Sequence, residues 1–325
     1  MSRDSMNRVA RYVGQGRVEI VQEPLPACPP GGLLVKTLAC GLCSGELMSW
    51  YMDRKIPHVL GHEVCAEVIV SQDERFTVGM RVFPHHHAPD LSSALSRRGA
   101  EVHDPQWRAT KLIPGGMADF FGVPAANLAD CLNVSGLRPQ EAALIEPLAC
   151  VVKAASRLKL RGDESVTVIG LGVMGLMFMR LLKGAQGVDI SESRRAWAAS
   201  QGLIAVAPEE AEKSEVVIVC PGSEQALDLA LSLAEPDPRI CLFAPMPPET
   251  ITGLDLHGLY FQDLTLTCSY SCGPRETKQA KELLEQGLFR AEDVVSDFIT
   301  LNELPEHYLA MKDGRILKPM VMFSR

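Results

Sequence analysis

The chain lacks three features that would each indicate a different class of protein. It has no run of about 18 to 20 apolar residues, the length that a membrane-spanning helix needs. It has no excess of basic residues, because 32 Lys and Arg stand against 40 Asp and Glu, for a net charge of −8. This balance gives no electrostatic reason to expect a nucleic acid or an anionic membrane as a partner. It also shows no internal repeat or low-complexity segment.

The start of the chain lacks the apolar segment of a secretory signal peptide. Residues 1–5 are mostly polar, and we therefore expect a cytoplasmic protein. The ten cysteines then need an explanation other than a disulfide framework, because the chain is neither small nor marked for secretion. Most of them, such as Cys220 and Cys241, lie in apolar runs and are expected to be reduced core residues.

Two domains of different class are predicted, because 325 residues exceed what one hydrophobic core usually serves. From residue 8 to about 124, short runs bounded by glycine and proline predict a mostly-β half. A short helix at 44–54 and a long polar loop at 88–108 interrupt it. A helical stretch over 138–158 follows. Strands and helices then alternate over 165–286, which predicts a parallel sheet with helices on both faces and a domain boundary near residue 153.

A glycine-rich turn opens the second half. Gly170, Gly172 and Gly175 follow a β-branched strand-like run and begin an apolar helix. In that position the first glycine allows a tight turn, the second lets a pyrophosphate approach the backbone, and the third lets helix and strand pack closely. The N-terminus of the helix would also face the phosphates with its positive end. We interpret the turn as a dinucleotide site rather than as ordinary turn glycines, with predicted contacts from Gly170, Gly172, Val173, Met174 and Gly175.

Asp189 is the candidate acid for the ribose hydroxyls of the cofactor. It favours NAD, because a carboxylate repels the additional phosphate of NADP. Its spacing is unusual: it lies 14 positions after Gly175, where about 20 are usual. Either the helix ends early near Gly184 or the next strand is cut short. Arg194 and Arg195 could instead bind a 2′-phosphate, which keeps NADP as the less favoured alternative; the plainest alternative makes Asp189 a surface turn residue.

Side chains that suit Zn²⁺ lie in three clusters ahead of the glycine turn. They are Cys43, the pair His62 and Glu63, and Glu146. A catalytic zinc site needs about three such ligands and an open position. Each residue alone has a plainer explanation, as a core thiol, a packed histidine or a surface charge. Glu146, however, lies in an apolar run where burial of an unpaired carboxylate would be costly, and a metal would remove that cost.

The motifs that contain these residues resemble the zinc-dependent medium-chain dehydrogenase/reductases of the alcohol dehydrogenase superfamily. The resemblance covers nearly the whole chain. The Glu-Pro-Leu form of the third motif is most similar to the sorbitol and polyol branch, with the threonine dehydrogenases nearby. The matching motifs are Ala-Cys-Gly-Leu-Cys at 39–43, Val-Leu-Gly-His-Glu at 59–63, Ile-Glu-Pro-Leu at 145–148, the glycine turn, Asp-Gly-Arg at 313–315 and Lys-Pro at 318–319.

The resemblance implies a two-domain α/β fold. A GroES-like, mostly-β catalytic domain would span 1–153, a Rossmann domain with a doubly wound parallel sheet 154–269, and a segment returning to the catalytic domain 270–325. The implied reaction is oxidation of a secondary alcohol, such as a polyol, sugar or amino-sugar hydroxyl, activated by zinc and passing a hydride to NAD. The implied partners are a small-molecule alcohol and further copies of this chain, as a homodimer or homotetramer.

The resemblance also assigns roles to single residues. Cys43, His62 and Glu146 would hold one catalytic zinc, with Glu63 as an alternative or exchanging ligand. Lys318, in the returning segment, would reach the pyrophosphate unless it is an exposed surface lysine.

The proton-transfer residues depart from the family pattern. The family usually has Ser or Thr two residues after the cysteine ligand, and here Gly45 stands at that position. Met48 replaces a histidine that is frequent further on. Ser44 or a water molecule could relay the proton instead, and Glu46 could orient His62 through a hydrogen bond.

A second departure concerns the structural zinc of the family. Many members hold it with four cysteines in a C-x₂-C-x₂-C-x₇-C pattern. Hydroxyls and carboxylates cannot reproduce a tetrahedral thiolate site. We therefore predict one zinc per chain and no structural zinc, and a loop that is mobile or held by partner contacts. The four positions carry Asp90, Ser93, Ser96 and Asp104.

Three further interpretations remain beside the leading one. His85, His86 and His87 are better explained as the end of a strand, with at most one ring facing the active site, than as metal ligands. A zinc-free reductase of the quinone or enoyl type is a second function on the same fold, which the retained ligand set disfavours. A non-catalytic dinucleotide-binding homologue is a third, which the missing hydroxyl at Gly45 keeps open.

Overall fold

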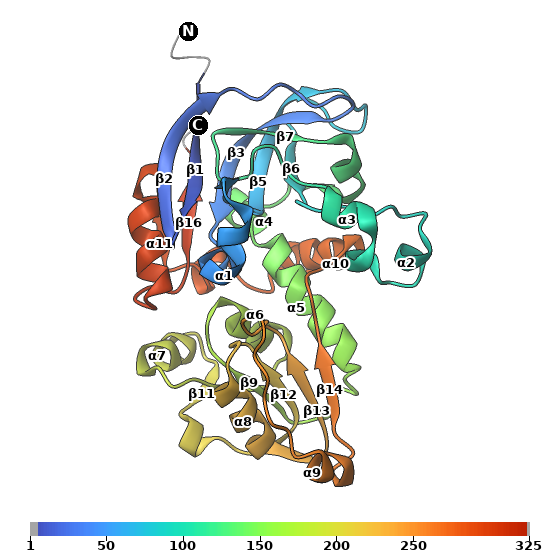
Figure 1. The fold of residues 1–325 in the computed structure, drawn as a ribbon, viewed down its shortest axis with the longest axis vertical. Helices are drawn as coiled ribbons and strands as arrows, with labels where there is room; N and C mark the ends of the chain where they lie inside the picture. The colour runs from blue at the N-terminus through green and yellow to red at the C-terminus, as the bar shows by residue number, and fades with distance from the viewer. Residues whose placement is uncertain (1–5, 324–325) are drawn as a thin grey trace. The chain divides into compact units, whose positions relative to one another are not determined.

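The computed structural model describes residues 6–323, which divide into two compact units (Figure 1). The first unit contains residues 6–149 and 272–323, and the second contains residues 150–271. Residues 1–5, on which the signal-peptide expectation rests, lie outside the described part. Within residues 6–323, no helix is long and apolar enough to cross a membrane.

The first unit is built on two β-sheets, as the glycine- and proline-bounded runs predicted. A three-stranded antiparallel sheet has the order β2-β1-β4. The larger sheet has the order β15-β16-β3-β5-β6-β8, and β7 also pairs with β3. The strands are β1 (Met6–Gly14), β2 (Arg17–Pro24), β3 (Leu33–Gly41), β4 (His58–Val59), β5 (Glu63–Ser71), β6 (Arg81–Pro84), β7 (Phe120–Val123), β8 (Cys131–Asn133), β15 (Asp297–Ile299) and β16 (Pro319–Met322).

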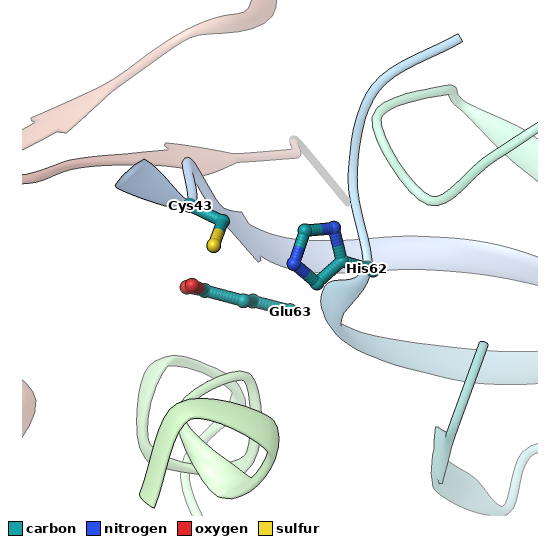
Figure 2. A group of neighbouring side chains, drawn as sticks. All are labelled: Cys43, His62 and Glu63. Carbon is teal, nitrogen blue, oxygen red and sulfur yellow. The ribbon is translucent and has the colours of Figure 1, made fainter. Parts of the chain in front are cut away.

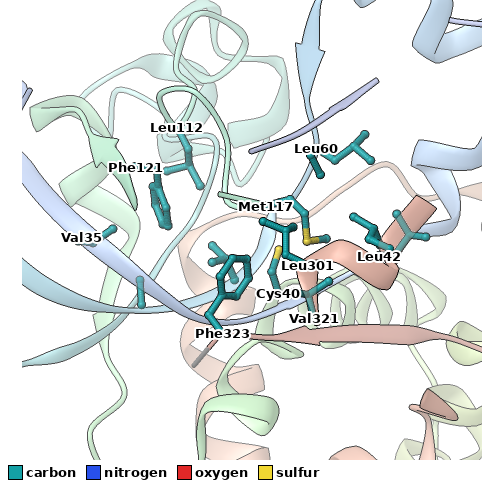
Figure 3. Packing of buried hydrophobic residues seen from close by; sticks show 14 of the residues in the cluster. Val35, Cys40, Leu42, Leu60, Leu112, Met117, Phe121, Leu301, Val321 and Phe323 are labelled. Atoms are coloured by element: carbon teal, nitrogen blue, oxygen red, sulfur yellow. The ribbon is translucent and has the colours of Figure 1, made fainter. Parts of the chain in front are cut away.

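The hydrophobic core of this unit fixes the larger sheet in place. Apolar side chains from β3 and β16 pack with residues of the neighbouring loops, and Figure 3 shows Leu60, Met117 and Val321 in this cluster. Each of the three is fully buried, at 0% exposure. Burying a side chain of this size stabilises a fold by about 1.5–3 kcal/mol.

The helices of the first unit are mostly short. The predicted helix over 44–54 is wrong as a single element, because Met48 has an extended backbone conformation that divides it. The predicted helical stretch over 138–158 is likewise two helices. The helical segments are η2 (Ser44–Leu47), α1 (Ser49–Met52), η3 (Asp53–Lys55), α2 (Ala94–Arg97), η4 (Glu101–His103), α3 (Pro105–Ala109), η5 (Ala125–Asp130), α4 (Pro139–Ala142), α5 (Ile145–Leu158), which continues into the second unit, α10 (Pro274–Glu285), η7 (Ala291–Asp293), η8 (Leu301–Glu303) and α11 (Leu304–Lys312).

Residues 88–108 form a small lobe rather than the predicted irregular loop. Ser93 caps α2 by accepting a hydrogen bond from the Ser96 N–H at 3.1 Å. Asp104 caps α3 by accepting from the Gln106 N–H at 2.9 Å, and it accepts from the Asp90 N–H at 3.1 Å. The prediction missed these elements because short helices of this kind are specified by capping side chains and show little apolar periodicity.

The four positions that carry cysteines in the zinc-bearing pattern are joined in pairs by hydrogen bonds, Asp90 with Asp104 and Ser93 with Ser96. The Ser93 and Ser96 hydroxyls lie 3.1 Å apart, and Asp104 is 2% exposed. Hydrogen bonds among its own polar groups join the parts of the lobe.

The second unit is a parallel six-stranded sheet with the order β11-β10-β9-β12-β13-β14. In chain order this is 3-2-1-4-5-6, the arrangement of a doubly wound dinucleotide-binding sheet, so the predicted fold class is confirmed. Its strands are β9 (Val166–Ile169), β10 (Gln186–Val188), β11 (Ile204–Val206), β12 (Ser214–Val219), β13 (Ala234–Leu242) and β14 (Thr265–Cys268). Its helical segments are α6 (Val173–Leu181), α7 (Glu192–Ser200), η6 (Pro208–Glu210), α8 (Glu224–Leu233) and α9 (Leu256–Phe261).

The strand order reverses at β9. The chain adds β10 and β11 on one side of β9 and then adds β12, β13 and β14 on the other side. Ligands of such sheets bind beyond the carboxyl ends of the strands at this switch point. The glycine turn follows β9 directly, so the topology places it there.

We predict that Asp104→Ala destabilises the protein by about 1–2 kcal/mol, because α3 loses its cap and the Asp90 N–H loses its acceptor. Burial alone would raise the pKa of Asp104, but hydrogen bonds from Ser93 and from backbone N–H groups together lower it. A lowered folded-state pKa contributes stability above the unfolded-state pKa, which is lost as the pH falls through the folded value.

Chemical denaturation at neutral pH and at about pH 3 measures this contribution. The difference between the wild type and Asp104→Ala should be larger at neutral pH. Ser92→Ala, on the same lobe and exposed, is the control and should change stability by less than about 0.5 kcal/mol. Equal stability of the Asp104 variant and the control at neutral pH would contradict this account of the lobe.

Candidate active site

A sulfur, a nitrogen and a carboxylate oxygen meet at one end of the larger sheet. The ligand atoms of Cys43, His62 and Glu63 all lie within 4.8 Å of one another, and Figure 2 shows the three side chains converging. The strand register explains the meeting, because Gly41 at the end of β3 lies opposite Glu63 at the start of β5. The residues just after β3 and just before β5 are thereby brought side by side.

Gly61 shapes the approach to His62. Its φ of +96° lies in the left-handed region, and an added Cβ would sit 2.3 Å from the backbone nitrogen of Met117. No side chain fits there without moving the backbone. The glycine of the Gly-His-Glu motif is therefore required by the turn that delivers the histidine.

Glu46 fixes His62 from behind. Its Oε1 lies 3.3 Å from His62 Nδ1 and accepts a hydrogen bond from the Gly61 N–H at 2.8 Å. Burial alone would raise the pKa of Glu46, but the neighbouring His62 and the Gly61 N–H bring it down to about 2. The carboxylate is therefore ionised, and it leaves the other ring nitrogen of His62 directed toward Cys43 and Glu63. The sequence predicted this contact.

Lys318 differs from both expectations for it. The side chain is 1% exposed, its ammonium forms an ion pair with Glu63, and it donates to the carbonyl of Leu42 at 2.9 Å. It is neither a surface lysine nor directed to a pyrophosphate. β16, which begins just after it, pairs with β3 at Gly41, and this register carries the lysine to the carboxylate. Burial raises the pKa of Glu63, and Lys318 acts in the opposite direction.

Glu146 belongs to a second group of ligand-type side chains. Its carboxylate lies within 4.8 Å of ring nitrogens of His85 and His86. The predicted set of Cys43, His62 and Glu146 is thus not gathered as one group; Glu63 takes the place of Glu146. Glu146 is nevertheless 6% exposed in the first turn of α5, as the apolar run around it predicted.

The three consecutive histidines have three different surroundings. His85 is fully buried, with Nδ1 at 2.9 Å from Asp130 and Nε2 at 3.7 Å from the Cys272 sulfur. His87 Nδ1 lies 2.8 Å from the carbonyl of Thr110. His86 also packs against His62, with its ring centroid 4.7 Å from that of His62.

The region of the missing hydroxyl leaves room for a side chain. An added Cβ at Gly45 would meet, among the described residues, only the Cys43 sulfur at 3.5 Å, which is an ordinary contact. Sterics therefore do not require glycine at this position. Ser44, the suggested replacement, is exposed on η2.

In the second unit, the three glycines of the turn have different reasons to be glycine. Gly170 has a φ of +90°, and a Cβ on Gly175 would sit 1.9 Å from the carbonyl oxygen of Gly170. A Cβ on Gly172 would meet no described atom within 4 Å, so the space above it is open. Val173 and Met174 form the first turn of α6, which no described side chain caps. These features suit a pyrophosphate bound at the helix N-terminus.

Asp189 follows β10 and is 5% exposed, so the surface-turn alternative is wrong. Its Oδ2 accepts from the Leu171 N–H at 2.7 Å, within the glycine turn. The short spacing is explained by both expected causes together, because α6 ends at Leu181 and β10 has only three residues. Arg194 lies 3.8 Å from the carboxylate, and Arg195 donates to the Asp189 carbonyl at 2.8 Å.

Comparison with known proteins agrees with both units. Residues 29–133 match the family model of the alcohol dehydrogenase GroES-like domain. The chain is 29% identical to D-altritol 5-dehydrogenase of Agrobacterium fabrum, over 90% of this chain and 93% of the relative. It is 26% identical to acryloyl-coenzyme A reductase of Metallosphaera sedula, over 92% of this chain and 95% of that relative.

The fold is also that of a solved dehydrogenase. The structure of 2R,3R-butanediol dehydrogenase from Bacillus subtilis superimposes with a TM-score of 0.84 at 21% identity, covering 98% of this chain and all of that one. This likeness shows that the chain has the two-unit fold of that dehydrogenase. Residues 29–133 are thus similar to the GroES-like domain of alcohol dehydrogenases, and over both units the chain is similar to a protein named as a dehydrogenase and to one named as a reductase.

Proposed function

We propose that the protein is a zinc- and NAD-dependent dehydrogenase that oxidises a secondary alcohol of the polyol or sugar-alcohol class. The observation that carries this proposal is the convergence of Cys43, His62 and Glu63 in the unit that matches the GroES-like domain. The relationship to D-altritol 5-dehydrogenase supports the choice of a polyhydroxylated substrate.

The donor set fits zinc. One thiolate, one imidazole and one carboxylate are the ligands of a catalytic zinc site that keeps an open position. The carboxylate would be Glu63, or Glu146 after a change of its side-chain conformation. When bound, zinc would lower the pKa of the alcohol hydroxyl, and the nicotinamide would accept the hydride.

The residues of this chain prepare that chemistry. Glu46 lies 3.3 Å from Nδ1 of His62 and would hold the ring in one orientation, which leaves the other ring nitrogen for a metal. Lys318 balances the charge of Glu63, so the buried carboxylate is tolerated before a metal binds and can exchange between lysine and metal. Proton relay is assigned to Ser44 or to water, since Gly45 offers no hydroxyl.

We propose NAD as the cofactor and one zinc per chain. Gly170, Gly172, Gly175 and the first turn of α6 would bind the pyrophosphate, and Asp189 would lie at the ribose. Asp90, Ser93, Ser96 and Asp104 form hydrogen bonds that take over the role of a structural metal. Active assemblies are proposed to be homodimers or homotetramers.

A reductase is the second candidate function. The relationship to acryloyl-coenzyme A reductase favours it, because that protein is similar over nearly its whole length. The convergent ligand set argues for the alcohol dehydrogenase, since a reductase that works without zinc has no need of these three side chains.

We expect Cys43→Ser to lower the zinc content well below one per chain and to reduce polyol oxidation by at least about 100-fold. Loss of a residue that only orients a metal ligand lowers metal affinity or activity by about 10–100-fold, and loss of the ligand itself should lower both further. Metal analysis and NADH formation with a polyol panel measure the two effects. Cys28→Ser, a partly buried cysteine in another part of the unit, should keep both zinc and activity. Full zinc and full activity in the Cys43 variant would refute the proposed metal centre.

We expect Glu46→Gln to reduce kcat by about 10–100-fold while the zinc content falls less than in Cys43→Ser. The amide removes the charge that holds His62 but keeps the size of the side chain. Steady-state kinetics on zinc-saturated protein distinguish this from unfolding, which circular dichroism monitors. Wild-type kcat in a folded Glu46→Gln protein would show that the carboxylate does not position His62.

We expect kcat/KM with NAD to exceed that with NADP in the wild type, and Asp189→Asn to lower the NAD value by about tenfold. One hydrogen bond to a charged group contributes about 1.5–3 kcal/mol, and loss of the Asp189 charge at the ribose should weaken NAD binding by an energy near the lower end of this range. Glu192→Gln, a neighbouring exposed carboxylate, is the matched control and should leave the cofactor preference unchanged. A wild type that prefers NADP would contradict the assignment of Asp189.

A further inference from the structure

Among the described residues, Nδ1 of His86 has no hydrogen-bond partner, although the ring packs 4.1 Å from that of His87. Asp130 and Cys272 hold His85, and His87 lies 2.8 Å from the Thr110 carbonyl with its ring centroid 4.0 Å from that of Trp107. These contacts fix the chain on both sides of His86. The backbone of His86 is fixed as well, because its carbonyl accepts from the Asn127 amide at 3.0 Å.

The His86 ring stands against the candidate metal centre. Its centroid lies 4.7 Å from that of His62, and one of its nitrogens lies within 4.8 Å of the Glu146 carboxylate. The side chain is half-buried, so one part faces the protein and another faces open space. His86 is therefore next to both a predicted zinc ligand and an alternative one.

A polar atom of this ring has no partner. His86 Nδ1 is buried and makes no hydrogen bond within residues 6–323. A buried polar atom left without a partner costs about 1–3 kcal/mol, and in native proteins such an atom calls for an explanation. Rotation of the ring by 180° exchanges the positions of nitrogen and carbon, so the unsatisfied nitrogen can also turn toward the open side. A ligand that brings a hydroxyl group would satisfy it.

Polyhydroxylated alcohols carry such a hydroxyl at the right place. With the reacting oxygen of a substrate at the metal, the hydroxyl on the adjacent carbon would be one carbon away, and the His86 ring, packed 4.7 Å from that of His62, is near enough to the metal residues to be its partner. A neutral imidazole offers one donor and one acceptor, and a hydroxyl group can use either. A simple secondary alcohol has an apolar group at that position and leaves the imidazole without a partner.

We propose that His86 is a specificity-determining residue that hydrogen-bonds the hydroxyl next to the reacting carbon and so selects vicinal polyols over simple secondary alcohols. This inference rests on the proposed alcohol dehydrogenase function and assigns a substrate class to the same site. A site built to hydrogen-bond a hydroxyl discriminates strongly against an analogue that lacks it.

The test compares two substrate classes in three variants. His86→Phe keeps a ring of similar size without polar atoms, His86→Asn keeps a donor and an acceptor, and His103→Phe alters an exposed histidine as the control. We expect His86→Phe to lower kcat/KM for polyols such as altritol and sorbitol by about 10–100-fold and to leave that for 2-butanol within about threefold. His86→Asn should recover part of the loss, and His103→Phe should behave as the wild type.

A binding measurement separates this inference from the proposed function. Zinc-loaded protein with NADH is titrated with each polyol, and the shift in melting temperature gives its affinity. We expect His86→Phe to weaken polyol binding by at least about tenfold at unchanged zinc content. Equal losses for polyols and 2-butanol, or unchanged polyol binding, would overturn the role of His86 even if the wild type is an active dehydrogenase. A wild type that binds polyols through His86 but oxidises none would overturn the proposed function alone.

Discussion

The antiparallel register between β3 and β5 is the constraint on which the candidate site depends. It places Gly41 opposite Glu63, and the chain leaves β3 toward Cys43 at the point where it arrives from His62. A side chain at the position opposite the glutamate would displace the Glu63 carboxylate, because a Cβ on Gly41 would lie 2.4 Å from one of its oxygens. A shift of one residue in this pairing would turn the side chains to the other face of the sheet and separate the ligand atoms.

Charged groups behind the ligands make this arrangement tolerable in a buried place. Glu46 and Lys318 each pair with a member of the group, one with His62 and the other with Glu63. Burying these ionisable side chains without a partner would destabilise the fold. With a partner they are tolerated, and they hold their neighbours in fixed orientations. Asp130 does the same for His85 on the adjacent strand end. The site is thus prepared by three buried pairs in which a carboxylate lies against a histidine or a lysine of the first unit.

Much of the fold could be predicted from the sequence, because alternation of apolar residues, glycine turns and strand–helix order are local properties. The glycine turn at Gly170 and the contact of Glu46 with His62 are visible in short motifs. The pairing of Glu63 with Lys318 could not be predicted in this way, since they are 255 positions apart in the sequence and only the register of β16 on β3 joins them. The lobe around Asp104 was missed because its helices are specified by capping hydrogen bonds rather than by apolar periodicity.

The metal centre is the central claim, and X-ray absorption at the zinc edge of the purified protein tests it most directly. We predict one zinc per chain whose neighbours are a single sulfur at about 2.3 Å and nitrogen or oxygen atoms at about 2.0–2.2 Å, as a ligand set of Cys43, His62 and one carboxylate requires. The sulfur contribution should disappear in Cys43→Ser. A shell of several sulfurs, or protein that takes up no zinc when folded and supplied with it, would contradict the account.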